Sequence, residues 1–210
     1  MISHKHKFLS LRIPKTGSTS VTTILKPYFD IESQGIGASE ENTYYHHRKT
    51  KYMKSHFEKM KWNFDDYFKF AFVRNPFERE VSLWKYLIRI KKEGETVEEK
   101  FSDFVKIPAN RSGGRPGAGY TYMDYVKDVD GTIILDFIGR FENLQQDFNT
   151  VCDKIGIPHQ QLPHRNKTKH KHYTEYYDDE TREIVAQKYA RDIEYFGYEF
   201  WEWSITHTNM

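Results

Sequence analysis

The sequence predicts a single α/β domain in which helices flank a central parallel β-sheet. Short apolar runs typical of strands alternate along the chain with segments whose apolar residues recur at helical spacing. This alternation is typical of a parallel sheet that is covered on both faces. The length of 210 residues also suits one domain, so we expect one domain over residues 1–210.

The expected elements follow from where these patterns begin and end. Asn75-Pro76 marks one boundary, because a residue before proline is pushed away from helix and proline fits a first helical turn. Five glycine or proline residues make Asn110–Tyr120 a loop, for which a lid, an acceptor-binding loop and plain disorder all stay open. The expected strands are 8–13, 68–73 and 132–138, and the expected helices are 18–27, about 50–60, 77–92, 96–106, 142–155 and 178–195.

The segment IPKTGSTSV, Ile13–Val21, follows the first apolar run and opens a helix. The first backbone N–H groups of a helix are unsatisfied, and the helix dipole adds partial positive charge there. Lys15 adds a full charge, and Gly17 lets the backbone approach an anion closely. The segment therefore predicts an anion-binding loop, with an ordinary capped turn as the alternative. Its four hydroxyl residues are Thr16, Ser18, Thr19 and Ser20.

A second segment, FKFAFVRNPFEREVSLW, combines a short apolar strand with a helix. Arg74 stands at the end of that strand, and Ser82 lies eight residues further on, inside the helix. Arginine suits a phosphate group because its planar fork can bond two oxygens at once. The alternative is that Arg74 only pairs with a surface acid. The helix has one apolar face, formed by Phe77, Val81, Trp84 and Ile88.

The two segments, in this order and about 60 residues apart, resemble the 5′-phosphosulfate loop and the 3′-phosphate segment of sulfotransferases. The resemblance is to the family that includes carbohydrate 2-O-sulfotransferases and their bacterial relatives. It implies a P-loop-like nucleotide-binding architecture. It also implies transfer of a sulfuryl group from 3′-phosphoadenosine 5′-phosphosulfate (PAPS) to a hydroxyl acceptor, by resemblance a carbohydrate, leaving the bisphosphate PAP.

The resemblance also assigns roles to particular residues. Lys15 would stabilise the departing phosphate, while Arg74 and Ser82 would hold the 3′-phosphate. A closing loop with Asn166, Lys167 and Thr168 would fold over the cofactor, although an exposed basic loop is an equally open reading of that segment. The residues implied to hold the phosphosulfate are Pro14, Lys15, Thr16, Gly17, Ser18, Thr19 and Ser20.

The acceptor hydroxyl must lose a proton as it attacks, and histidine is the usual base near neutral pH. In the family a histidine lies between the two phosphate segments, with an apolar residue six positions later followed by a lysine. His47 fits this pattern, with Met53 and Lys54 in those places. His56 and His46 fall in the same interval, so the choice stays open and His47 is favoured.

Composition excludes several classes of protein. The net charge of +2 lacks the basic excess of a general nucleic-acid binder. A single cysteine, Cys152, cannot form an internal disulfide and is expected to be a buried, inert thiol. No stretch approaches the ~20 apolar residues of a membrane span, and the first residues are too polar for a signal peptide. We therefore expect a cytoplasmic protein with no membrane partner.

Two other functions stay open. A nucleotide-dependent phosphotransferase would need an acid that holds Mg²⁺ after a strand, and Asp136 is the obvious candidate. A non-catalytic binder of sulfated or phosphorylated polymers would keep the basic residues and need no base. Sulfuryl transfer itself requires no metal, because fixed cations and dipoles can supply the electrostatic stabilisation.

Overall fold

The computed structural model describes residues 1–30, 49–90, 100–107, 120–163 and 171–201. The chain divides into two compact units. Met1–Val73 and Tyr122–Asn166 form the first, which we call the sheet unit because it carries the β-strands. Arg74–Thr121 and Lys167–Met210 form the second, which we call the helical unit.

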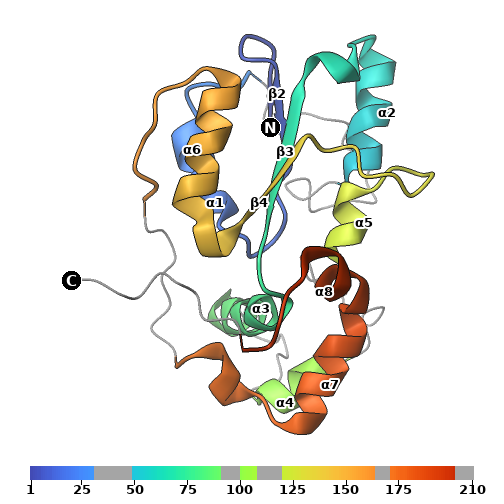
Figure 1. Ribbon diagram of the computed structural model, residues 1–210, viewed down its shortest axis with the longest axis vertical. Coiled ribbons are helices and arrows are strands. Elements are labelled where there is room, and N and C mark those ends of the chain that lie inside the picture. Colours follow the sequence, from blue (N-terminus) through green and yellow to red (C-terminus); the bar gives the residue numbers. More distant parts are fainter. Residues whose placement is uncertain (31–48, 91–99, 108–119, 164–170, 202–210) are drawn as a thin grey trace. The chain divides into compact units, whose positions relative to one another are not determined.

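The sheet unit contains a four-stranded mixed sheet in the order β1-β2-β3-β4 (Figure 1). The inner pairs are parallel, with Phe8 opposite Phe68 and Phe70 opposite Phe137. The first pair is antiparallel, so the expected all-parallel sheet is wrong at this edge. The reason is a tight turn through Lys7, which has a left-handed φ of 49° and returns the N-terminal residues alongside the next strand. The strands are β1 (Ile2–Ser3), β2 (Phe8–Ser10), β3 (Phe68–Val73) and β4 (Phe137–Arg140).

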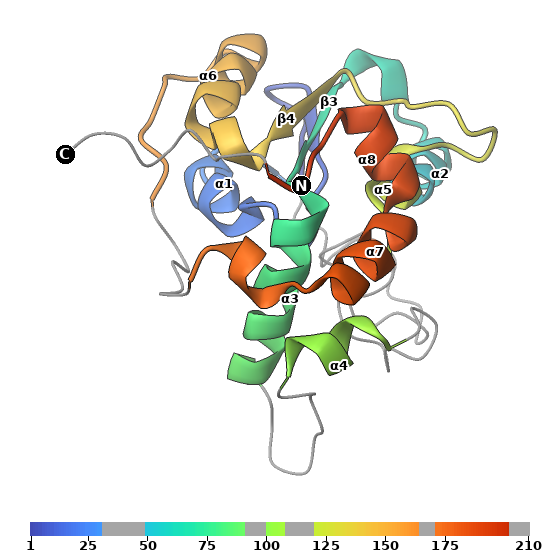
Figure 2. The ribbon, with the colours of Figure 1, turned by 60° about the horizontal axis from the view of Figure 1, so that its bottom comes forward.

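Helices cover both faces of this sheet, as expected. The pair α1 (Ser18–Leu25) and α6 (Leu144–Ile155) lies on one face, and α2 (Thr50–Met60) with α5 (Tyr122–Val126) lies on the other (Figures 1 and 2). Five of the six residues of β3 are buried, which is typical of a strand enclosed on both faces. The principal core cluster between the sheet, α1 and α6 includes Phe8, Val21, Leu25, Phe70, Phe72, Phe148, Val151 and Cys152.

Cys152 lies in this core as a free thiol. Burial raises the pKa of its thiol to about 11, because removal from water disfavours the thiolate. The thiolate is the reactive form, so Cys152 is a packing residue at neutral pH. This agrees with the expectation of a buried, inert cysteine.

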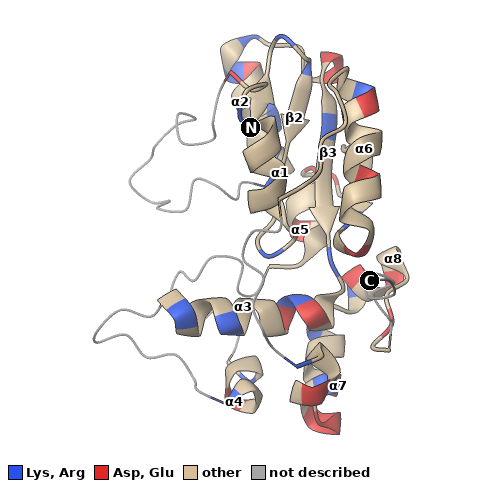
Figure 3. Ribbon diagram, turned by 90° about the vertical axis from the view of Figure 1, so that its left-hand side faces the viewer, with Lys and Arg blue, Asp and Glu red and all other residues tan. Residues whose placement is uncertain are grey.

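The helical unit contains α3 (Pro76–Ile90), α4 (Phe101–Val105), α7 (Asp179–Lys188) and α8 (Ala190–Phe196). Its core is rich in aromatic side chains that meet edge to face, an arrangement favoured by the ring quadrupole. Figure 3 shows that α3 carries acidic and basic residues near its start and only basic residues toward its end. The core residues are Phe77, Val81, Leu83, Trp84, Leu87, Phe101, Phe104, Val105, Tyr173, Val185 and Tyr189.

Several expected boundaries are wrong. The last strand is β4 at Phe137–Arg140 and not 132–138, because the Asp136 carboxylate accepts the Lys69 N–H and ends the ladder there. The expected helix 178–195 is divided at Tyr189, whose ψ of 21° ends α7. The short helix α5 was not expected, and β2 is shorter than 8–13. Residues 96–99 and most of the Asn110–Tyr120 loop lie outside the described residues.

Candidate active site

The anion-loop segment begins after β2 and ends in α1, as the sequence predicted. Lys15 has a left-handed φ of 68°, and Gly17 has a left-handed φ of 78°. The left-handed conformation is unfavourable by roughly 1–2 kcal/mol for a residue that has a side chain, such as Lys15. Such strained backbone clusters at functional sites, where the surrounding structure holds it in place. The left-handed backbone at Lys15 is therefore consistent with a functional role for the loop, beyond joining a strand to a helix.

Gly17 is needed here for packing as well as for backbone conformation. A Cβ built on this glycine would lie 2.7 Å from Leu144 Cδ2 and 3.1 Å from Phe141 Cδ2. The loop thus lies directly against the residues that lead into α6. The sequence suggested only close approach to a ligand, and this second requirement was not visible in it.

The four hydroxyls of the loop divide into two kinds. The Thr16 hydroxyl donates to the Ile13 carbonyl at 3.0 Å, which holds the loop closed. The Ser20 hydroxyl donates to the Pro163 carbonyl at 2.7 Å, which ties α1 to a distant segment. The hydroxyls of Ser18 and Thr19 donate no hydrogen bond within the part of the chain that the structure describes. They are therefore the two hydroxyls that can face a ligand.

The backbone amides of the loop, like these two hydroxyls, are available to a ligand. The amides of residues 16–19 donate no hydrogen bond to any described residue, and no side chain caps α1. Successive N–H groups in a turn of this kind form an anion-binding concavity, to which a helix dipole contributes. Residues 15–19 therefore present a lysine, four amides and two hydroxyls suited to a phosphate or sulfate group.

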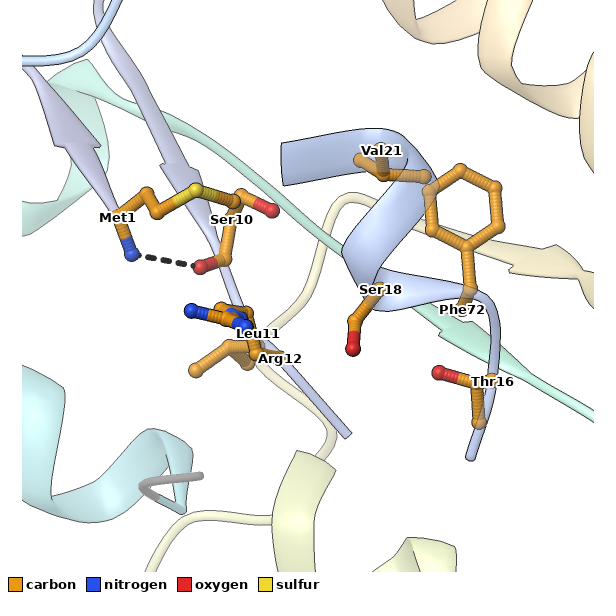
Figure 4. Close-up of a pocket in the computed structure, with 8 residues that line it drawn as sticks. All are labelled: Met1, Ser10, Leu11, Arg12, Thr16, Ser18, Val21 and Phe72. Carbon is orange, nitrogen blue, oxygen red and sulfur yellow. Dashed lines mark hydrogen bonds between the residues drawn. The ribbon is translucent and has the colours of Figure 1, made fainter. Parts of the chain in front are cut away.

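A small pocket adjoins the loop on its β2 side. Figure 4 shows Thr16 and Ser18 on one side of this pocket and Arg12 on the other. Arg12 thus adds a second basic residue close to the loop. Arg12 was not among the predicted site residues, although it stands directly before the IPK segment in the sequence. The remaining lining residues are Met1, Ser10, Leu11, Val21 and Phe72.

The second predicted segment also has the expected local structure. Arg74 directly follows β3 and is 8% exposed. Its guanidinium Nη2 lies 2.5 Å from Glu78 Oε1, so Arg74 does pair with an acid, but one that is itself largely buried. The Asn75 side chain accepts the Phe77 N–H at 3.0 Å, which orients the start of α3. Ser82 is half-buried on α3 and makes no hydrogen bond within the described residues.

The structure places His56 at the edge of the sheet where the parallel strands begin. Its ring lies 5.7 Å from that of Trp62, and the Trp62 ring lies 4.4 Å from that of His4. His4 precedes β2, whereas the anion loop follows β2. An 11-residue helix is about 16 Å long, so the beginning of α2 lies toward the opposite edge (Figure 1).

The other predicted site residues lie outside the described residues. These are His46 and His47, which precede α2, and Asn166, Lys167 and Thr168, which follow Pro163. The structure therefore brings together the residues of the anion loop, while Arg74, just before α3, pairs with Glu78 and Ser82 lies inside α3. The roles assigned to all of these residues stay predictions.

Asp136 does not have the setting of a magnesium ligand at the anion loop. Its carboxylate lies 3.0 Å from Lys69 Nζ and accepts the Lys69 N–H at 2.7 Å. It precedes β4 and so belongs to the same edge as His4. Within the described ranges, no group of three or more His, Cys, Asp or Glu residues could hold a metal ion.

An α/β sheet with a loop of this kind between a parallel strand and a helix is suited to phosphate- or sulfate-bearing ligands. The chain belongs to the sulfotransferase family, whose family model matches residues 1–199. The resemblance found in the two segments is thereby confirmed.

Individual relatives agree with this assignment. Human carbohydrate sulfotransferase 9 is 24% identical over 218 residues, covering 91% of this chain, and zebrafish carbohydrate sulfotransferase 14 is 24% identical over 230 residues, covering 94%. The chain spans only 47% and 61% of the length of these two relatives. An uncharacterised protein of Archaeoglobus fulgidus is 33% identical over 99 residues, which are 45% of this chain and 72% of that protein.

A solved structure supports the fold. The crystal structure of a sulfotransferase from Alicyclobacillus acidocaldarius superposes with a TM-score of 0.53 at 14% sequence identity. The match covers 90% of this chain and 92% of that protein. The α/β fold class is therefore confirmed, with the antiparallel β1 as its correction. None of the helices in the described ranges has the length and apolar character needed to cross a membrane.

Proposed function

We propose that this protein transfers a sulfuryl group from PAPS to a hydroxyl group of a saccharide, with PAP as the second product. The observation that carries this proposal is the loop after Lys15, in which the amides of residues 16–19 and the hydroxyls of Ser18 and Thr19 donate no hydrogen bond to a described residue. Family membership supports sulfuryl transfer, whereas the donor and the acceptor are the finer part of the proposal.

The proposed reaction assigns the loop an electrostatic role. The acceptor oxygen forms a bond to sulfur as the bond between sulfur and the bridging phosphate oxygen breaks. Negative charge then grows on the bridging oxygen, where Lys15 and the amides of residues 16–19 stabilise it. The Ser18 and Thr19 hydroxyls hold the same group in line for attack.

Arg74 and Ser82 would bind the 3′-phosphate of the nucleotide. Arg74 stands between β3 and α3, and Ser82 lies eight residues further on, inside α3. Arg74 is largely buried, which strengthens its attraction for an anion relative to a fully hydrated arginine. The family resemblance also implies contacts between the nucleotide and three residues of the closing loop, Asn166, Lys167 and Thr168.

His47 is the proposed base that accepts the proton of the acceptor hydroxyl. It precedes α2, whose first residue lies toward the sheet edge where β2 and β3 end. His56, near the other end of α2, packs against Trp62. This difference favours His47 over His56, and His46, next to His47 in the sequence, stays a third candidate.

A saccharide acceptor is proposed because two relatives are carbohydrate sulfotransferases. The cytoplasmic location expected from the sequence stays a prediction. A screen of candidate saccharides with radiolabelled PAPS would identify the acceptor.

Nucleotide binding tests the proposal directly. We expect PAP to bind the purified protein more tightly than 5′-AMP in calorimetry, because only PAP carries the phosphate assigned to Arg74. Charged hydrogen bonds contribute roughly 1.5–3 kcal/mol, which corresponds to about 10–150-fold in affinity. Equal affinity for both nucleotides would remove the role of Arg74 and Ser82.

Thermal unfolding with other ligands separates the alternatives. Stabilisation by PAP in the absence of Mg²⁺ supports sulfuryl transfer, because no metal is needed to bind the bisphosphate. Stabilisation by ATP only when Mg²⁺ is present would indicate a phosphotransferase instead. A protein stabilised by neither, but by a sulfated polysaccharide, would be a non-catalytic binder.

A further inference from the structure

Glu78 lies between the two residues proposed to hold the 3′-phosphate. Glu78 and Ser82 lie four residues apart within α3 and so share one side of the helix, whereas Arg74 stands just before the helix. An ion pair joins Arg74 to Glu78. The sequence assigned a role to Arg74 and Ser82 and none to the acid between them.

The Arg74–Glu78 pair is close and largely removed from water. Arg74 Nη2 lies 2.5 Å from Glu78 Oε1, and the two side chains are 10% and 16% exposed. In that setting charges attract and repel more strongly than on an open surface, because solvent and salt screen them less. A second anion brought to Arg74 is therefore repelled by the Glu78 carboxylate.

We infer that Glu78 is a built-in counter-anion of Arg74 that weakens binding of 3′-phosphorylated nucleotides. This inference rests on the proposed function. The carboxylate orients the guanidinium plane and neutralises its charge before the nucleotide arrives. A 3′-phosphate then gains only part of the attraction that an uncompensated buried arginine would offer. The consequence is easier release of PAP, a step that limits turnover in many enzymes.

The substitution Glu78→Gln tests this role. The glutamine amide oxygen can still accept the hydrogen bond from Arg74, while the negative charge is lost. We expect PAP to bind about three- to tenfold more tightly to E78Q than to wild type, and 5′-AMP to bind equally to both. Calorimetry with the two nucleotides on both proteins gives the comparison.

A matched control is Glu183→Gln on α7 of the same unit. Glu183 is exposed and accepts a hydrogen bond from Gln187, so this variant removes the same charge from a solvated position. We expect its affinity for PAP to equal that of wild type. A tighter binding of PAP to E183Q, as strong as that of E78Q, would overturn the inference, because net charge alone would then explain the effect.

The remaining outcomes separate this inference from the proposed function. An unchanged or weaker affinity of E78Q for PAP, with wild type still preferring PAP to 5′-AMP, overturns the inference alone. Glu78 would then only orient Arg74 or stabilise the first turn of α3, and a lowered unfolding temperature of E78Q would show the latter. A wild type without preference for PAP overturns both, because Arg74 would hold no 3′-phosphate.

Discussion

Lys15 combines a full positive charge with a left-handed backbone conformation at the centre of the anion loop. Its neighbours on the chain provide amides that donate no hydrogen bond to described residues. A charge placed in this way acts most strongly where negative charge develops during the reaction. Lys15 is therefore expected to serve the transition state more than the binding of the product nucleotide.

We predict that Lys15→Ala lowers kcat by roughly 100-fold or more, by analogy with the removal of one oxyanion donor. Affinity for PAP should change much less, because PAP lacks the breaking bond. Steady-state kinetics and calorimetry measure the two effects. Lys61→Ala is a matched control, since Lys61 is also a left-handed lysine, at the end of α2. If kcat survives in K15A and only KM for PAPS rises, Lys15 is an anchor and not a transition-state group.

Replacing His47 and His56 one at a time tests which of these two histidines is the base. His47→Ala should lower the transfer rate by roughly 10²–10⁴-fold and leave PAP binding intact, because the base contacts the acceptor and not the nucleotide. His56→Ala should retain activity, since its ring packs against Trp62 at the other end of α2. Transfer assays with an authentic acceptor decide between them. An inactive H56A beside an active H47A would move the base to His56.

At the scale of elements, α3 and the α7–α8 junction share a buried polar contact in the helical unit. Glu80 on α3 is fully buried and accepts from the Lys188 ammonium and, at 3.1 Å, from the Tyr189 hydroxyl. Its second oxygen has no hydrogen-bond partner within the described residues. Burial, together with the charge of Glu80, raises the pKa of Tyr189 well above its usual value, so this tyrosine stays a neutral donor.

Lys188→Met should therefore lower the free energy of unfolding by about 3 kcal/mol, because it leaves a buried carboxylate without its counter-charge. Urea unfolding measures this loss. Lys106→Met removes a lysine from the exposed Lys106–Glu180 pair of the same unit and should leave stability nearly unchanged. Adding Glu80→Gln to K188M should restore much of the lost stability. Equal destabilisation by K188M and K106M would mean that burial of the Glu80 pair has no energetic consequence.

At the scale of the whole molecule, the protein has almost no net positive charge. The 32 lysine and arginine residues nearly balance the 30 aspartate and glutamate residues. The proposed binding of an anionic nucleotide would then depend on a few positioned donors, such as Lys15 and Arg74, more than on general attraction.

The two segments with the family resemblance could be recognised in the sequence because the residues that mark each one are close together in the chain. In the first, a lysine, a glycine and hydroxyls lie within six residues at the point where a strand leads into a helix, a pattern suited to an anion. In the same way, the Asn75-Pro76 pair marks the boundary between β3 and α3 in the sequence itself. Periodic apolar residues predicted α2, α3 and α6 closely for the same reason.

Tertiary structure decided what depends on partners far apart in the chain. The Ser20 hydroxyl bonds the carbonyl of Pro163, and Gly17 packs against Leu144, so neither role could be read from the loop alone. Spacing could not tell which edge of the sheet His56 occupies, because that follows from its contact with Trp62. The division at Tyr189 likewise depends on a long-range contact, its hydrogen bond to Glu80, which local propensity does not encode.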